Sequence, residues 1–146
     1  MNYKKWLIED LLTLERQRFA ISQLREELET VEAEYTAIKA TNYDKMPTGS
    51  GENVQEEKLL TAIAKKDELR ASLIYTEKHV ADMERLLKQL PDDERQIIER
   101  TFVGQEKYAA ESLADELGYE RRNIYRMRNR ALLHLAQLRY GAAYRP

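Results

Sequence analysis

Arginine is the residue type in this chain that most clearly suggests a binding function, and it is concentrated near the C-terminal end of the sequence. From Gly118 to Pro146 there are seven arginines and no lysine against one acidic residue, Glu120, which gives a net charge of +6. The whole chain carries −2, so the preceding residues are acidic, and the pI of about 5.8 conceals this separation. Clustered guanidinium groups attract phosphates, so this segment predicts contact with a nucleic-acid duplex.

Six of the seven arginines fall on a predicted helix that runs from Glu120 to about Arg139. A short helix over Ala109–Leu117 and a left-handed turn at Gly118 are expected to precede it. Two helices joined by such a turn form a helix-turn-helix, whose second helix enters the major groove. The apolar positions that predict its buried face are Ile124, Met127, Ala131, Leu135 and Leu138.

The side chains available for DNA contact match the known chemistry of base and phosphate recognition. Arginine pairs with guanine and asparagine with adenine through two-point contacts, whereas tyrosine contacts a phosphate or a thymine methyl group. The candidate DNA-contacting residues are Arg121, Arg122, Asn123, Tyr125, Arg126, Arg128 and Arg130.

A further helix is expected just before this pair. Pro91 and the acids that follow it favour a helix start, and the helix continues to about Val103, where Gly104 ends it. The expected packing residues of this helix are Ile97, Ile98 and Phe102.

These residues carry a family resemblance that covers Leu90–Arg139. The run LPDDERQIIERTF, then Leu113-Ala-x-x-Leu-Gly118, then Ala131-Leu-x-x-Leu135, resembles the DNA-binding region 4 of sigma-70-type factors. The resemblance implies base contacts from Arg121, Arg122 and Arg126 and phosphate contacts from Arg128 and Arg130. Ala109 and Glu120 stand where the family usually has a capping serine. The glutamate could accept a hydrogen bond from a cytosine amine.

The N-terminal part is predicted to be a long antiparallel helical hairpin. Leu7, Leu14, Ile21, Leu28 and Tyr35 recur every seven residues, and a matching run begins near Val54. This spacing is typical of coiled-coil helices, and it leaves open whether the pairing is within one chain or between chains. A flexible loop is expected at 41–53. Because a two-helix hairpin has a thin core, we expect a homo-oligomer, with a dimer favoured.

The predicted fold is therefore all-α: a helical hairpin over 1–89 and a helix-turn-helix domain over 90–146. This arrangement also resembles the phage and prophage late-gene activators of the ArpU/RinA type. That resemblance implies a sequence-specific transcriptional regulator in the bacterial cytoplasm, with double-stranded DNA and bacterial RNA polymerase as partners. No promoter-melting region is recognisable, so a complete sigma factor is not expected.

Other classes of function find little support in the sequence. There is no cysteine, no apolar run of membrane-spanning length, no phosphate-binding glycine loop and no nucleophile motif. His79 and His134 have no ligand-spaced partner, so no metal, cofactor or catalytic site is expected. Two alternatives remain: a phage small terminase-type DNA-packaging subunit, and a coiled-coil adaptor that binds RNA polymerase or another protein without DNA. The target sequence, the direction of regulation and the role of the loop are not indicated.

Overall fold

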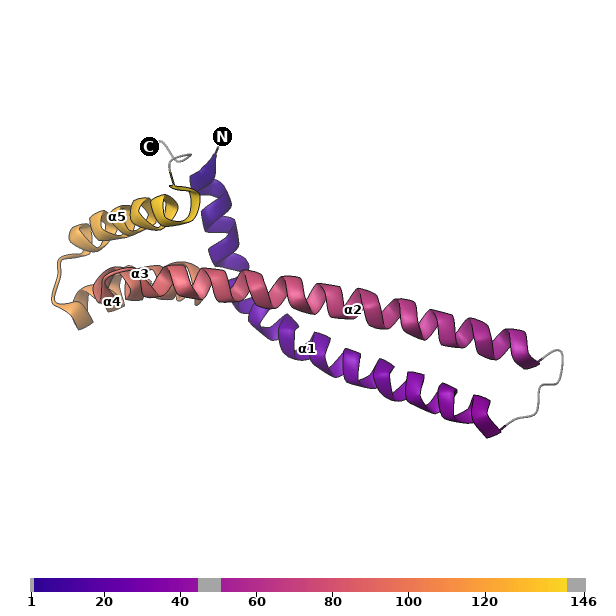
Figure 1. The fold of residues 1–146 in the computed structure, drawn as a ribbon. Helices are drawn as coiled ribbons and strands as arrows, with labels where there is room; N and C mark the ends of the chain where they lie inside the picture. Colours follow the sequence, from indigo (N-terminus) through magenta and orange to yellow (C-terminus); the bar gives the residue numbers. More distant parts are fainter. Residues whose placement is uncertain (1, 45–50, 142–146) are drawn as a thin grey trace. The chain divides into compact units, whose positions relative to one another are not determined.

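Every regular element in the described part of the chain is a helix. A computed structural model of the protein describes residues 2–44 and 51–141, and for residues 42–44 and 51–53 it describes the backbone alone. The predicted all-α fold, a long helical hairpin followed by short helices packed together, is confirmed (Figure 1). The elements are α1 (Tyr3–Asp44), α2 (Gly51–Lys88), α3 (Asp92–Ile98), the π-helical segment η1 (Glu99–Val103), α4 (Ala109–Leu117) and α5 (Arg121–Tyr140).

The chain divides into two compact units. The helix-turn-helix unit comprises Met1–Gln17 together with His79–Pro146, and the hairpin unit comprises Arg18–Lys78. The first turns of α1 thus belong to the same unit as α3, α4 and α5, whereas the heptad pattern predicts a hairpin over 1–89 that includes them. A heptad pattern identifies the side chains that are buried, but it does not identify the element that buries them.

The two helical segments of the hairpin unit run in opposite directions. Arg25 donates to Glu77 across the pair at 2.8 Å. Seven residues later in α1, Glu32 accepts from Arg70 at 3.2 Å, and Arg70 lies seven residues earlier than Glu77 in α2. Partners that move in opposite directions along two helices define an antiparallel pair. Within one chain the two segments therefore pair with each other as the predicted hairpin.

The core of the hairpin unit is thin. Among its described residues, the buried apolar side chains are Val31 and Ala62, and the other seam positions are half-buried. Large apolar side chains also remain in solvent, because Phe19, Ile74 and Tyr75 expose 64%, 60% and 73% of their surface. A pair of helices buries only the stripe along which they touch, which accounts for this distribution.

The connection between the long helices is shorter than the predicted loop. That prediction began at Thr41, but α1 continues to Asp44 and α2 begins at Gly51, so the predicted loop boundaries are wrong. The Thr41 hydroxyl donates to the Ala37 carbonyl at 2.8 Å, as threonine does inside a helix. No proline or glycine stops the helix before Asp44. The rest of the predicted flexible loop, 45–50, lies outside the described residues.

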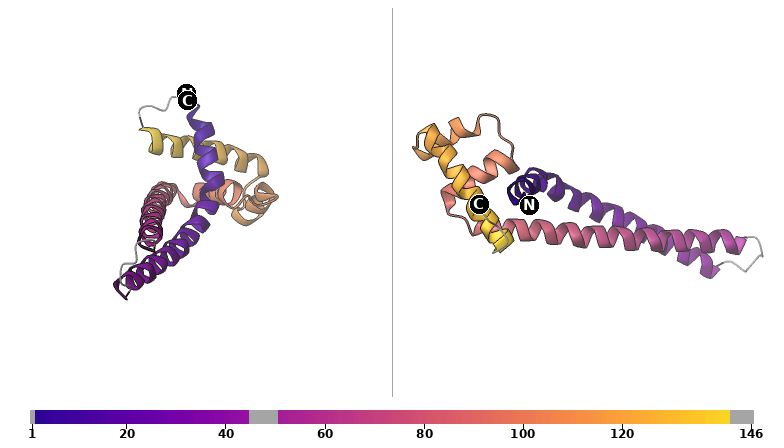
Figure 2. Two further views of the ribbon diagram at one scale, coloured as in Figure 1. Left: turned by 90° about the vertical axis from the view of Figure 1, so that its right-hand side faces the viewer. Right: turned by 90° about the horizontal axis from the view of Figure 1, so that it is seen from above.

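The start of α1 packs against the end of α5 within the helix-turn-helix unit. Arg139 donates to Asp10 at 2.8 Å, and the rings of Tyr3 and Tyr140 lie 4.8 Å apart between centroids. Figures 1 and 2 both show the first turns of α1 beside the last turn of α5. The apolar residues of this α1 segment are fully buried at 0% exposure: Leu7, Leu11 and Leu14.

The remaining core of this unit joins α3, α4 and α5. Ile97, Ala109, Leu113 and Ile124 form one buried cluster, as the apolar spacing of the three helices predicted in part. Further along α5, the fully or nearly fully buried residues are Ala131, Leu132, Leu135 and Ala136.

Two residues of the predicted packing set are less buried than expected. Leu138 exposes 42% of its surface, so its assignment to the packed face of α5 is wrong, and Leu132 and Ala136 are buried in its place. The contact surface of α5 follows the four-residue spacing from Leu132 to Ala136, which turns Leu138 away. Phe102 is only half-buried. It lies in η1, where wider π-helical turns change the direction of each side chain.

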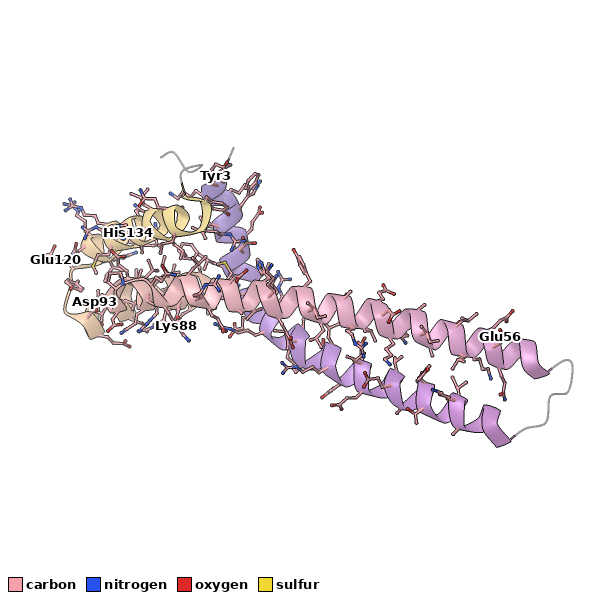
Figure 3. The ribbon with its side chains drawn as sticks, viewed as in Figure 1. Tyr3, Glu56, Lys88, Asp93, Glu120 and His134 are labelled. Atoms are coloured by element: carbon pink, nitrogen blue, oxygen red, sulfur yellow. The ribbon has the colours of Figure 1, made fainter. Side chains whose placement is uncertain are left out.

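A buried carboxylate lies between α3 and α5. Glu94 is 5% exposed, and its Oε2 is 3.0 Å from Nδ1 of His134. This hydrogen bond joins the carboxyl group to a ring nitrogen of the imidazole. His134 lies partly exposed on α5 (Figure 3). The sequence did not indicate this partner, because the two residues are 40 positions apart.

Replacing His134 with alanine is expected to lower the free energy of unfolding by about 1–3 kcal/mol, because the buried Glu94 carboxylate then loses its partner. Urea unfolding followed by circular dichroism measures the change. Gln137→Ala, an exposed site on the same helix, is the control and should stay within about 0.5 kcal/mol of the native protein. Equal stability of the two variants would show that solvent replaces the imidazole without cost.

Candidate nucleic-acid interface

A tight turn at Gly118 sets the direction of α5 relative to α4. Gly118 has φ 76°, a left-handed conformation that glycine adopts without steric cost. Its N–H and that of Tyr119 both donate to the Ala114 carbonyl, at 3.0 and 3.1 Å. The predicted helix bounds of α4 and the predicted left-handed turn are confirmed. This arrangement of two helices is the helix-turn-helix that the sequence predicted.

The turn is also attached to α3. The Tyr119 hydroxyl donates to Asp93 at 2.9 Å, and this hydrogen bond raises the pKa of Tyr119. Figure 3 marks Asp93 and Glu120 at this end of the unit. Glu120 occupies the N-cap of α5 in extended conformation, and its carboxylate makes no capping hydrogen bond. The N-cap of α4 is Tyr108 rather than Ala109, and it also makes no side-chain cap.

The outward face of α5 carries a row of unengaged cations. Arg122, Arg126 and Arg130 follow one another at four-residue intervals, so they lie along one side of the helix. All three are exposed, and none makes an ion pair with any residue that the structure describes. Asn129 is exposed on the same side, and Asn123 is half-buried at its edge. No acid from α5 itself lies on this face, because Arg121–Tyr140 contains none.

A second group of predicted residues lies on the neighbouring face of α5 and is already engaged. Arg121 forms an ion pair with Glu111 at 3.0 Å and donates to the Tyr125 hydroxyl at 3.3 Å. The hydrogen bond to Tyr125 and then the charge of Glu111 raise the pKa of Arg121. The guanidinium of Arg128 lies over the Tyr125 ring, 4.9 Å from its centroid. Tyr125 is therefore held between two arginines.

The structure thus divides the seven predicted site residues into two groups. The resemblance grouped Arg121 with Arg122 and Arg126 as base readers, but the structure brings Arg121 together with Tyr125 and Arg128. These last two residues also line an open pocket of about 300 Å³ beside the start of α4. The sequence did not indicate the contact to Glu111. It could have indicated Asn129, which follows Arg122 by seven residues.

Two acidic residues near α4 share one arginine as their ion-pair partner. Arg100 of η1 donates to both oxygens of Glu106, at 2.7 and 3.1 Å, and also binds Glu116. These bonds connect η1, the loop before α4 and the end of α4. They also reduce the negative charge that a phosphate backbone would meet beside α5.

The Glu106 carboxyl is expected to titrate below an ordinary glutamate, because the hydrogen bond from Arg100 lowers its pKa. Its ionised form therefore stabilises the fold above the unfolded-state pKa of about 4.3, and this contribution disappears as the pH falls through the lower folded-state value. An NMR titration of the side-chain carboxyl carbon measures the shift. Arg100→Gln should return the pKa of Glu106 towards 4.3, whereas Arg95→Gln on α3 should leave it unchanged.

The described residues show no other recognisable chemical site. His79 approaches Asp10 at 3.9 Å, and no group of three or more potential metal ligands occurs among the residues searched. Within the described ranges, no helix combines the length and apolarity needed to cross a membrane. Comparison of the chain with models of known protein families, with curated proteins and with solved structures finds no significant match.

Proposed function

We propose that the protein binds double-stranded DNA in a sequence-specific manner, with α5 in the major groove, and regulates transcription. The observation that supports this proposal is the outward face of α5, where Arg122, Arg126 and Arg130 are exposed and make no ion pair within the described residues. Exposed guanidinium groups on the second helix of a helix-turn-helix suit both phosphates and guanine edges. No catalytic, metal or cofactor role is proposed.

The biological setting of the proposal comes from the sequence resemblance. The run from Leu90 to Arg139 resembles sigma-70 region 4, and the arrangement with a preceding long-helix region resembles phage and prophage late-gene activators. We therefore propose a regulator of phage or prophage late genes that acts in the bacterial cytoplasm together with the host RNA polymerase.

The hairpin unit is proposed to bind protein, either a second copy of this chain or the polymerase. Its exposed Phe19, Ile74 and Tyr75 offer apolar contact area that DNA does not require. Light scattering of the purified protein tests this role. A dimer fits a regulator that reads two half-sites. A ring of many copies would favour a small terminase-type packaging subunit instead.

The proposed function is tested by incubating fragmented genomic DNA of the source organism with the full-length protein at near-physiological salt and sequencing the fragments that are retained. A few sharp peaks next to genes establish sequence-specific regulation and give the operator. The same experiment with the variant Arg122→Ala/Arg126→Ala/Arg130→Ala is the comparison, and its retained DNA should show no peak.

Broad enrichment that salt removes would contradict sequence-specific recognition, because phosphate contacts alone show that behaviour. No retention of DNA at all, with a folded protein, would favour the adaptor alternative. In that case removal of Leu90–Pro146 should leave capture of the protein partner intact.

A further inference from the structure

The outward face of α5 presents one amide in line with the arginines of the proposed DNA-binding row. Arg122, Arg126 and Asn129 are separated by four and then three residues, which places the three side chains along a single line on the helix. All three are exposed. At about 1.5 Å of rise per residue, the distance along the helix from Arg122 to Asn129 is roughly 10 Å, or about three base-pair steps. This length therefore matches the short stretch of major groove that one recognition helix reads.

Arg121, the third base-contacting arginine that the resemblance implies, does not lie in this row. Arg121 is bound by Glu111 at 3.0 Å and by Tyr125 at 3.3 Å, on the neighbouring face of α5. Its guanidinium supports Tyr125 rather than projecting with Arg122. The side chain of Asn129, in contrast, makes no hydrogen bond or ion pair with the described residues.

The row also has a chemical boundary. Arg130 follows Asn129 and lies at the rim, where a cation suits a phosphate. One turn further, Leu133 is half-buried and apolar, so it offers no hydrogen bond to a base edge. Asn129 is thus the last side chain before this apolar boundary that carries both a donor and an acceptor.

We propose that Asn129 reads an adenine in the DNA target, at the opposite end of the recognised stretch from the base read by Arg122. This inference rests on the proposed function. The side-chain carbonyl of Asn129 accepts from the adenine N6 amine, and its amide N–H donates to N7. Arg122 and Arg126 each offer two donors to the O6 and N7 acceptors of guanine. The target therefore has a G·C pair towards Arg122 and an A·T pair towards Asn129.

The test is selection from a pool of random-sequence duplexes with the full-length protein, Asn129→Ala and Gln137→Ala. Gln137 is the matched control, because it is an exposed amide about two turns further along α5, beyond the row. The native protein and Gln137→Ala should select the same motif. Asn129→Ala should lose the preference for adenine at one position, with discrimination there reduced by about 5- to 150-fold and the other positions unchanged.

A modified duplex then identifies the atoms involved. Substituting 7-deazaadenine, which lacks the N7 acceptor, at the position found should weaken binding by the native protein and leave binding by Asn129→Ala unaffected. An unchanged motif from Asn129→Ala, or equal loss for both proteins with the modified base, overturns the inference. A native protein that selects no motif overturns the proposed function as well, so the two failures are distinguishable. Circular dichroism of each variant confirms that it is folded.

Discussion

Replacing Leu11 with alanine is expected to lower the free energy of unfolding of the helix-turn-helix unit by about 2–5 kcal/mol. Leu11 is 0% exposed, and so are Leu7 and Leu14, one turn away on either side. The Leu11 side chain is surrounded by other protein atoms, so its truncation leaves a cavity among well-packed neighbours. The loss is large for a unit whose total stability is expected to be of the order of 5–15 kcal/mol.

Urea unfolding followed by the fluorescence of Trp6 measures this effect, because Trp6 is the single tryptophan and lies in the same segment of α1. Arg16→Ala is the control, since Arg16 is exposed on the same helix and in the same unit, and it should change stability by less than about 0.5 kcal/mol. If Leu11→Ala unfolds at the same urea concentration as the native protein, α1 does not contribute to the core of this unit.

The combined variant Arg122→Ala/Arg126→Ala/Arg130→Ala is expected to bind its DNA target at least about a hundredfold more weakly, because each lost contact costs about 1–3 kcal/mol. Fluorescence anisotropy with a labelled duplex from the genomic selection measures the affinity at several salt concentrations. The dependence on salt should also become less steep, by about 0.9 for each phosphate contact removed.

The matched control for this variant is Lys58→Ala/Lys65→Ala/Lys78→Ala. Those three lysines are exposed in the hairpin unit, so the control removes the same total charge from a different surface. It should bind the duplex with nearly native affinity. Equal weakening in both variants would mean that net charge, rather than the row on α5, determines DNA binding.

The helix-turn-helix geometry was predictable because its signals are local. Gly118 is the residue type that tolerates a left-handed turn, and the apolar spacing on each side fixes the packed faces of α4 and α5. The antiparallel pairing in the hairpin unit was also indicated, because two runs with one seam each are joined by a segment containing Pro47. The turn at Gly118 and the apolar seam of each helix depend on residues within a few turns of one another.

The contacts that join distant parts of the chain were not predictable from the sequence. Nothing in the sequence relates Asp10 to Arg139, or Glu94 to His134, because a single chain gives no measure of spatial proximity between separate helices. The π-helical segment was also missed. At the end of η1 the Gly104 N–H donates to the carbonyl of Glu99, five residues earlier. No particular residue type marks this π-helical hydrogen-bond pattern in a sequence.

The candidate site was predictable in composition but not in its division into two faces. All seven residues named from the sequence lie on α5, and the arginines that remain unengaged were among them. The engagement of Arg121 depends on Glu111, a residue of α4 whose distance from α5 is set by the turn. Side-chain orientation on a helix follows from its periodicity, whereas side-chain availability depends on the neighbouring element.

The composition of the helix-turn-helix unit has a consequence for the order in which the protein folds during synthesis. Leu7, Leu11 and Leu14 leave the ribosome before all of Arg18–Lys78, while the α5 residues of the same unit follow it. The hairpin unit is continuous in sequence, so its chain is complete while α5 is still being translated. A chain that stalls before α5 therefore carries the whole hairpin sequence and leaves Leu7, Leu11 and Leu14 without the helix that completes their unit.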